Sequence, residues 1–292
     1  MIGMEKLLKK SIDLHVHVGP EPILRRYGVK TLAMAVEGKL AGVCAKRHFS
    51  STAEEVAKLE GKFNLQLFGS LVLNSQVGGL KPQLIYKNAA LVKNPLVVWF
   101  PTISAQNFLN QSKYEIPPEW VERKDFKPRL SSEAEGISVI DSRGVVTADA
   151  SACLKAIAET GSILATGHIS WKESKALVEE AVRLGVTRII VTHPIYQKIA
   201  MPLEVQRELA ALGAFIEQSY AMYSIDKIPI EKIARNIRKI GADRTILSSD
   251  VGQITGPSPD EALKDFCMEL TKVGISRREL ETMLVVNPRK LA

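Results

Sequence analysis

The five histidines of the sequence are its most informative residues: His15, His17, His48, His168 and His193. Each stands at the end of a short apolar run that is typical of a buried β-strand. His15 and His17 are two residues apart, and side chains at positions i and i+2 of a strand point to the same face. Both imidazoles can therefore bind one metal ion, because neutral histidine is a common metal ligand.

Other polar residues at strand ends extend this set. Asp250 follows the apolar run that begins at residue 245, and its carboxylate could both bind a metal and move a proton. Lys46 and His48 stand two residues apart at the end of another run, so they share a face. A single histidine at a strand end is more often structural. Five of five in such positions favour a metal site over coincidence, provided that the strand ends converge.

The composition narrows the functional classes. The chain has 292 residues, of which 46% are hydrophobic and 24% are charged, as in ordinary globular proteins. The net charge of +7 comes from basic residues scattered among acids, which predicts neither a nucleic-acid partner nor a membrane partner but would favour an anionic small molecule. The three distant cysteines form no CxxC pair, and no apolar run approaches the ~20 residues of a membrane span, so we expect a cytoplasmic protein.

The elements that must position these residues alternate along the whole chain. Apolar runs predict eight strands, at 12–19, 42–49, 65–74, 96–102, 162–169, 188–194, 214–220 and 245–252. Helical patterns fill most of the gaps, at 31–41, 52–59, 82–92, 149–160, 172–184, 202–212, 230–240 and 259–272. This alternation predicts an α/β protein with one domain, residues 1–292, folded as a (β/α)8 TIM barrel. An open doubly wound sheet is the main competitor, but no GxGxxG motif follows the first strand.

One connection is longer than a barrel needs. Residues 103–148, between the fourth and fifth expected strands, are polar and irregular and include Pro117, Pro118 and Pro128. A hairpin is expected at 137–146, around the turn Asp141-Ser142-Arg143-Gly144. We interpret 103–148 as an inserted, lid-like segment, and a plain surface insertion is the alternative.

Taken in order, these residues resemble the pattern of the amidohydrolase superfamily, metal-dependent hydrolases on a TIM barrel. That pattern has HxH after strand one, histidines after strands five and six, and aspartate after strand eight, and the match covers nearly the whole chain. The residues next to His168, His193 and Asp250 resemble those of a poorly characterised branch of this superfamily. The resemblance implies that His15 and His17 ligate the more buried ion, that His168 and His193 ligate a second ion, and that Asp250 binds metal and shuttles a proton.

The sequence departs from this pattern at one position. Binuclear members carry a bridging Glu or carboxylated Lys at the end of strand four, but here that strand ends in Trp99-Phe100-Pro101-Thr102. Three interpretations stay open. In the first, Lys46 is carboxylated and bridges two ions, or His48 ligates one ion. In the second, the site holds one ion and keeps His193 for acid–base work. In the third, Lys46 is a cation that binds a substrate anion. The candidate catalytic residues are therefore Asp250, Lys46 and His193.

The resulting hypothesis is a hydrolase that uses one or two divalent ions, Zn first and Mn, Ni or Fe as alternatives, on a small-molecule amide, lactone, ester or phosphoester. One alternative is a mononuclear lyase, a decarboxylase or hydratase; another is a non-catalytic metal-binding barrel. A homo-oligomer is compatible with the apolar outer helices. Arg25 and Arg26 are interpreted as surface charges. Glu217, an acid inside a strand, is expected either to orient a ligand histidine or to pair with Lys46.

Overall fold

The computed structural model describes residues 2–121 and 125–292. Its strands are short and parallel: β1 (Ile12–His17), β2 (Gly42–Lys46), β3 (Gln66–Phe68), β4 (Ser70–Val72), β5 (Val97–Trp99), β6 (Ile163–Ala165), β7 (Ile189–Val191), β8 (Phe215–Ser219) and β9 (Thr245–Ser248). Nearly every strand residue is buried, which explains why the strands read as continuous apolar runs rather than as alternating ones.

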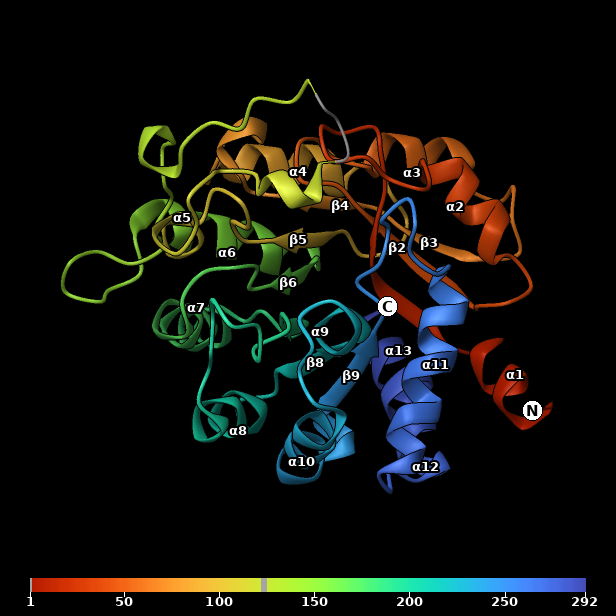
Figure 1. Ribbon diagram of the computed structural model, residues 1–292. Coiled ribbons are helices and arrows are strands. Elements are labelled where there is room, and N and C mark those ends of the chain that lie inside the picture. The colour runs from red at the N-terminus through yellow and green to blue at the C-terminus, as the bar shows by residue number, and fades with distance from the viewer. Residues whose placement is uncertain (1, 122–124) are drawn as a thin grey trace.

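The helices lie around the outside of the strands, as Figure 1 shows. They are α1 (Ile2–Leu8), α2 (Val29–Val36), α3 (Ala53–Leu59), α4 (Pro82–Ala89), α5 (Gln106–Asn110), α6 (Ala148–Thr160), α7 (Trp171–Arg183), α8 (Leu203–Ala211), α9 (Tyr220–Ser224), α10 (Ile230–Ile240), α11 (Pro259–Lys272), α12 (Arg277–Glu281) and α13 (Asn287–Leu291). Among the described residues the other helical segments are 3₁₀ turns at 75–77, 118–120, 131–133 and 242–244, and a π-helical turn at 282–286.

The helix ends follow local chemistry. Helix α7 begins at a capping box, in which Ser170 accepts the Glu173 N–H and Glu173 accepts the Ser170 N–H. Helix α6 begins where Thr147 accepts the Ala150 N–H and ends at Gly161, whose φ of 64° is the left-handed conformation that glycine adopts without steric cost. These caps explain why the helical segments could be placed from sequence.

The strands form two parallel sheets, one in the order β1-β2-β3 and one in the order β4-β5-β6-β7-β8-β9. The expected strand at 65–74 is divided at Gly69, because β3 pairs with β2 whereas β4 pairs with β5. Between β2 and β4, hydrogen bonds that involve side chains take the place of a backbone ladder. Ser70 Oγ donates to the Ala45 carbonyl at 2.7 Å, and the Ser70 N–H donates to Thr52 Oγ1 at 2.8 Å.

The first and last strands also approach each other. Asp250 N–H donates to the His15 carbonyl at 2.9 Å, and His17 N–H donates to the Val251 carbonyl at 2.7 Å. Among the described residues only an isolated bridge, Val16 with Val251, joins these segments, and no ladder does. The structure therefore confirms an α/β fold of parallel strands surrounded by helices. The described strands pair as two sheets and not as one continuous barrel.

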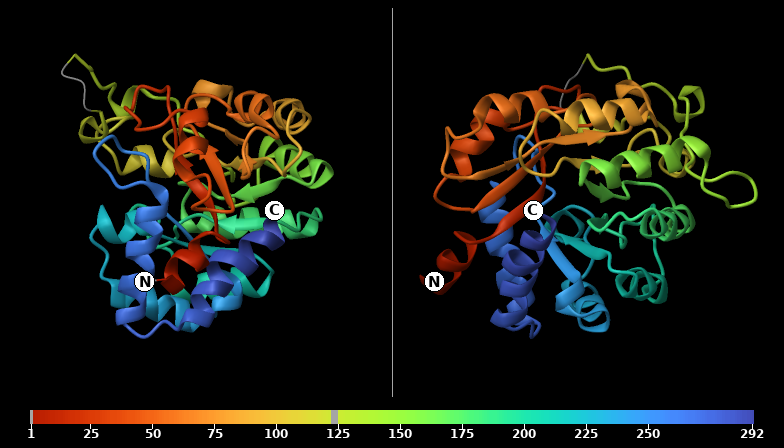
Figure 2. Two further views of the ribbon diagram at one scale, coloured as in Figure 1. Left: turned by 90° about the vertical axis from the view of Figure 1, so that its right-hand side faces the viewer. Right: turned by 180° about the vertical axis from the view of Figure 1, so that it is seen from behind.

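Apolar side chains pack both outside and inside the strands. The larger cluster lies between the strands and the helices. The smaller cluster lines the inside and comprises Ile12, Leu14, Cys44, Phe68, Val72, Val97, Trp99, Ile163, Ala165, Ile190, Phe215, Ile246 and Leu291. Leu291 comes from α13, and the C-terminus projects onto the middle of the molecule in Figure 1 and in the right-hand view of Figure 2, whereas the left-hand view of Figure 2 places it toward one side. The C-terminal residues thus fill one end of the interior.

An irregularity in β1 turns its histidines toward the interior. Ile12 and Leu14 belong to the inner cluster, so strict alternation would place His15 and His17 on the opposite face. The register between β1 and β2 shifts between Asp13 and Val16. This shift, a bulge-like feature, brings His15 to the same side as Trp99, with 5.4 Å between the ring centroids.

The 103–148 segment contains α5 and two 3₁₀ turns, and residues 122–124 within it lie outside the described residues. The hairpin expected at 137–146 is reduced to one antiparallel bridge between Ile140 and Val146, closed by a hydrogen bond from Asp141 N–H to the Val145 carbonyl at 2.8 Å. A lid role for this segment stays a prediction. None of the described helices has the length and apolar character needed to cross a membrane.

Candidate metal centre

A cavity of about 540 Å³ lies at the ends of the strands, where parallel α/β proteins build their sites. His17, His48, His168, His193 and Asp250 all line it. The structure therefore brings together side chains that are as much as 233 residues apart in sequence. Their individual roles as ligands or catalytic groups stay predictions.

His15, His17 and Asp250 form the tightest group, in which each residue offers one ligand atom within 4.8 Å of the others. Asp250 Oδ1 lies 3.1 Å from Nε2 of both imidazoles. All three residues are buried. Two nitrogens and one oxygen around one point are the donor set that Zn2+ and similar divalent ions accept, so these residues fit a metal ion.

Glu217, on β8, fixes the proton of His15. Its Oε1 lies 3.0 Å from His15 Nδ1 and accepts the Ser248 hydroxyl at 2.7 Å, while its Oε2 accepts the His193 N–H at 2.9 Å. Burial opposes ionisation, but the charges of His15 and His193 and these hydrogen bonds outweigh it and lower the pKa of Glu217 to about 2. An ionised carboxylate only accepts, so His15 Nδ1 carries a proton and donates it to Glu217, which leaves Nε2 facing Asp250 and Lys46.

Lys46 ends β2 and is completely buried beside the same histidine. Its Nζ lies 2.9 Å from His15 Nε2 and 4.9 Å from the centre of the Trp99 ring. Burial lowers the pKa of the ammonium group to about 8, although the charges of Asp250 and Glu217 favour the charged form. The alternative in which Glu217 pairs directly with Lys46 is not observed, since no hydrogen bond or ion pair joins these two described residues.

His193 and Asp250 adopt backbone conformations that are rare for residues with side chains. Their φ angles are 22° and 53°, in the left-handed region. His193 Nε2 lies 3.9 Å from Asp250 Oδ2. Strained residues of this kind concentrate at functional sites, where the surrounding structure holds them in place. Both strand-end residues are therefore held at the cavity at a cost in local backbone energy.

His168 and His48 complete the ring of imidazoles. The His168 ring lies 5.1 Å from that of His193 and 6.5 Å from that of His48. His48 Nδ1 lies 2.9 Å from Thr102 Oγ1, which leaves Nε2 for another partner. Within the described part of the chain, the buried Nδ1 atoms of His168 and His193 have no hydrogen-bond partner. Such unsatisfied polar atoms are uncommon and fit a site that binds a further group.

Burial keeps most of these imidazoles neutral. Desolvation, with the nearby positive charges, lowers the pKa of His17, His48 and His168 well below 6.5. The pKa of His193 is also lowered by desolvation, although Asp250 and Glu217 oppose the shift. A neutral imidazole has the lone pair that metal coordination and proton acceptance both require.

Two residues of the loop after β1 belong to the site, contrary to expectation. Arg25 was expected to be a surface charge, but its side chain is only 5% exposed. Its Nε donates to Glu21 Oε1 at 2.7 Å, and its Nη2 donates to His17 Nδ1 at 3.2 Å. Glu21 was missed altogether. Their i,i+4 spacing was the available signal, but it suggests an ion pair only if the loop is locally coiled.

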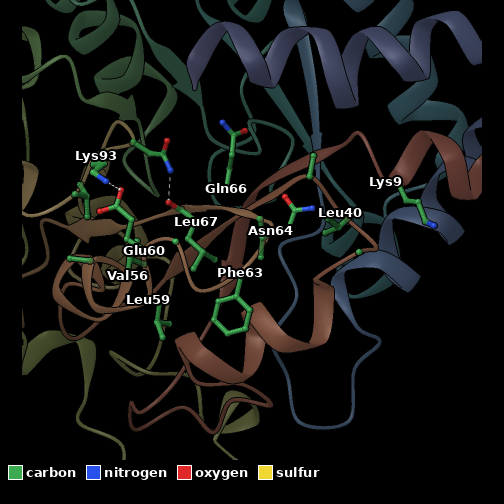
Figure 3. Close-up of a pocket in the computed structure, with 17 residues that line it drawn as sticks. Lys9, Leu40, Val56, Leu59, Glu60, Phe63, Asn64, Gln66, Leu67 and Lys93 are labelled. Carbon is green, nitrogen blue, oxygen red and sulfur yellow. Dashed lines mark hydrogen bonds and ion pairs between the residues drawn. The ribbon is translucent and has the colours of Figure 1, made fainter.

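A second cavity, of about 630 Å³, opens at the opposite ends of the strands (Figure 3). Lys93 pairs with Glu60 there at 2.9 Å, and the Lys93 side chain is 81% exposed. The lining residues contain no histidine, cysteine or aspartate. Conserved chemistry in barrels is built at the other face, so this cavity has no part in the site.

Solved structures share this fold. The chain is similar to an amidohydrolase from Pseudomonas aeruginosa at a TM-score of 0.62 and 10% identity, over 99% of this chain and 97% of that one. It is also similar to the probable dipeptidase PvdM from the same organism, at a TM-score of 0.61 and 12% identity, over 99% and 96%. An organophosphate-hydrolysing enzyme engineered from a weak promiscuous lactonase template has a TM-score of 0.53 and 16% identity, over 98% and 96%.

These likenesses define the fold as that of the amidohydrolase superfamily, as the order of histidines and aspartate predicted. The family itself is shown by sequence. Residues 10–217 match the model described as Family of unknown function (DUF6282), and the chain belongs to that family. No curated protein matches the chain.

Proposed function

We propose that this protein is a metal-dependent hydrolase. His15, His17 and Asp250 hold a divalent ion, for which Zn2+ is the first candidate, and the ion activates a water molecule that attacks a small-molecule substrate. The observation that carries the proposal is the His15–Glu217 pair, at 3.0 Å, in the group that also contains His17 and Asp250. An ionised carboxylate that orients a histidine through its other nitrogen is the arrangement that supports metal-bound histidines in proteins.

The chemistry divides between the ion and the chain. When bound, such an ion lowers the pKa of a coordinated water to about 7 and polarises a carbonyl or phosphoryl oxygen. Asp250 then has the geometry of a proton carrier, since Oδ1 faces His15 and His17 while Oδ2 faces His193. Asp250 takes a proton from the attacking water and delivers it to the leaving group. Neutral His193 is the neighbouring group that can share this proton.

The cavity supports a small substrate with an apolar part and an anionic part. Ile23, Leu24, Trp120, Met222 and Ile225 give it an apolar wall, and its volume of about 540 Å³ suits a small molecule. Lys198 also lines the cavity, with Nζ 4.1 Å from the centre of the Phe108 ring. The names of the similar structures indicate amide, peptide, lactone and organophosphate bonds as the first bonds to test.

Finer features of the fold belong to the same proposal. The hydrogen bonds between β1 and the segment after β9, and those of Ser70 and Thr52, support one barrel closed at both junctions of the two sheets. We also propose that the described residues of the 103–148 segment cover the mouth, because Trp120 lines the cavity. The three free, buried cysteines suit a cytoplasmic location. A homo-oligomer stays a prediction.

Lys46 carboxylation can be tested directly. The neutral amine is the form that reacts with CO2, and a pKa of about 8 makes it accessible near neutral pH. A carboxylated Lys46 gives a carbamate signal by 13C NMR when metal-loaded protein is incubated with 13C-labelled bicarbonate. Lys46→Arg, which forms no carbamate, is the control. A spectrum without this signal in the wild type would leave Lys46 as an amine that binds His15 or a substrate anion.

The proposal as a whole is tested by metal content and turnover. Purified protein should contain a divalent ion, and chelation should abolish hydrolysis found in a screen of amides, dipeptides, lactones and phosphotriesters. His15→Ala and Asp250→Ala should lose both the metal and the activity. Glu60→Gln, in the cavity at the other end of the strands, is the matched control and should keep both. Full metal content in the His15 and Asp250 variants would refute the proposal.

A further inference from the structure

A second group of potential metal ligands adjoins the first. His17, Glu21 and His48 each offer one ligand atom, and these atoms lie within 4.8 Å of one another. The group shares His17 with the site proposed above. Glu21 supplies a carboxylate to this group, whereas the end of the fourth expected strand supplies none. On donor chemistry alone, two nitrogens and a carboxylate oxygen would suit a second divalent ion.

This group already holds a cation, the guanidinium of Arg25. Arg25 Nε donates to Glu21 Oε1 at 2.7 Å, and Nη2 donates to His17 Nδ1 at 3.2 Å. The Glu21 side chain is fully buried and that of Arg25 is 5% exposed. The other Glu21 oxygen accepts the His48 N–H at 2.8 Å. The side chains of His17 and Glu21 are thus already hydrogen-bonded, to the Arg25 guanidinium and to the His48 backbone N–H.

We infer that the Arg25 guanidinium is the resident cation of the group formed by His17, Glu21 and His48 and keeps a second divalent ion out of it. The inference rests on the metal site of the proposed function and states what occupies the group next to it. A guanidinium stays charged at any physiological pH and has five N–H donors and no acceptor. A divalent ion placed between His17 and Glu21 would meet this buried charge at contact distance, in surroundings that screen it poorly.

The hydrogen bonds of His17 agree with this assignment. Arginine only donates, so His17 Nδ1 accepts with its lone pair, and the proton of the neutral ring lies on Nε2, 3.1 Å from Asp250 Oδ1. With an ion held by Nε2, the proton of the neutral ring would lie on Nδ1, and the hydrogen bond from Arg25 Nη2 would be lost. The bond from Arg25 Nε to Glu21 does not involve His17, so the arginine keeps its place beside the carboxylate.

Metal stoichiometry tests the inference without any substrate. Metal-free protein is titrated with ZnCl2 in a calorimeter, and the bound metal is counted by mass spectrometry after desalting. We expect the wild type to bind one Zn2+ per chain. Arg25→Met, which removes the charge and keeps most of the side-chain length, should bind two. Arg25→Lys, which keeps a positive charge, and the double variant Arg25→Met with Glu21→Gln should each bind one.

The outcomes separate the inference from the proposed function. Two ions in the wild type would overturn the inference and leave the hydrolase proposal standing; this result does not depend on any variant folding. One ion in a folded Arg25→Met protein, checked by circular dichroism, would overturn it as well. No specific Zn2+ binding by the wild type would overturn the proposed function, and the inference with it.

Discussion

Glu217 is the residue on which the electrostatics of the centre depend most. It is buried on β8 and accepts hydrogen bonds from His15 Nδ1, the His193 backbone N–H and the Ser248 hydroxyl. Its pKa of about 2 means that it stays ionised throughout the pH range in which proteins are usually studied. A permanent negative charge behind His15 strengthens that imidazole as a donor to a metal ion.

Replacement of Glu217 by glutamine should weaken metal binding. The amide can still accept from His15 Nδ1, but it lacks the charge, so we expect the affinity for Zn2+ to fall roughly 10–100-fold. Competition with a chromophoric chelator measures the affinity. Ser248→Ala removes one hydrogen bond to the same oxygen without changing any charge and should have a smaller effect. An unchanged affinity in Glu217→Gln would mean that Glu217 has only a structural role.

Asp226 leads to a prediction of how the stability of the folded state depends on pH. It is half-buried at the cavity, where desolvation and the charge of Asp250 raise its pKa to about 6, although Lys198 opposes the shift. Because the unfolded carboxyl titrates near 3.8, its ionisation destabilises the folded state increasingly as the pH rises from 4 to 6, and constantly above. The penalty is at most about 3 kcal/mol, and solvent screening reduces it.

Asp226→Asn should therefore be more stable than the wild type at pH 7.5 and equal to it at pH 3.8 or below. Urea denaturation of metal-free protein at both pH values measures the difference. The low-pH comparison is the control for any change in packing. A variant that gains the same stability at both pH values would show that the effect is not one of ionisation.

Most residues of the metal centre could be identified from the sequence, but not all of their hydrogen-bond partners. The histidines could be found because strand ends converge in this fold and histidine is rare in the sequence, and Asp250 because it also follows an expected strand. Glu21 and Arg25 could not, since their burial depends on how the loop after β1 folds back over His17. Periodicity carries no information about such a loop.

At the scale of elements, long periodic segments were predictable and short ones were not. Helices α6, α7, α10 and α11 match their expected ranges to within one residue at each end. The five-residue helices α5, α9, α12 and α13 show no periodicity that a pattern could reveal, because they contain little more than one turn. The division at Gly69 was also missed, since an apolar run does not show where a strand changes its partner.

Gly167 tests how one turn positions a functional residue. It connects β6 to His168 with a φ of 69°, and a Cβ atom there would lie 2.2 Å from the Phe100 carbonyl oxygen. Gly185 has a similar φ of 82° with nothing within 4 Å. Alanine at either position costs about 1–2 kcal/mol in backbone energy. Gly167→Ala must also displace the backbone that accepts the His168 N–H.

We therefore expect Gly167→Ala to lose clearly more stability in urea denaturation than Gly185→Ala, and to disturb His168. The chemical shifts of the imidazole protons report that disturbance independently of stability. Equal losses in the two variants would show that the close approach at Gly167 relaxes without consequence.

At the scale of the whole molecule, alternation along the chain was sufficient to predict an α/β fold with strands inside and helices outside. It could not show how the interior is closed at the end away from the metal centre. Leu291 fills that position. It is fully buried in the inner cluster with Ile12, Phe215 and Ile246, and Asn287 anchors its helix through hydrogen bonds to the Ala242 and Thr245 carbonyls, each at 2.7 Å.

Leu291→Ala should accordingly cost about 2–5 kcal/mol of unfolding free energy, the range for emptying a leucine position in a packed core. Leu212→Ala is the matched control, because that side chain is 42% exposed and its removal should change stability by less than about 0.5 kcal/mol. Urea denaturation measures both. Leu291 belongs to the same cluster as Trp99, whose ring centroid lies 5.4 Å from that of His15, so the loss should also weaken Zn2+ binding, whereas Leu212→Ala should leave it unchanged. A Leu291→Ala protein as stable as the control would mean that the interior is closed without the C-terminal helix.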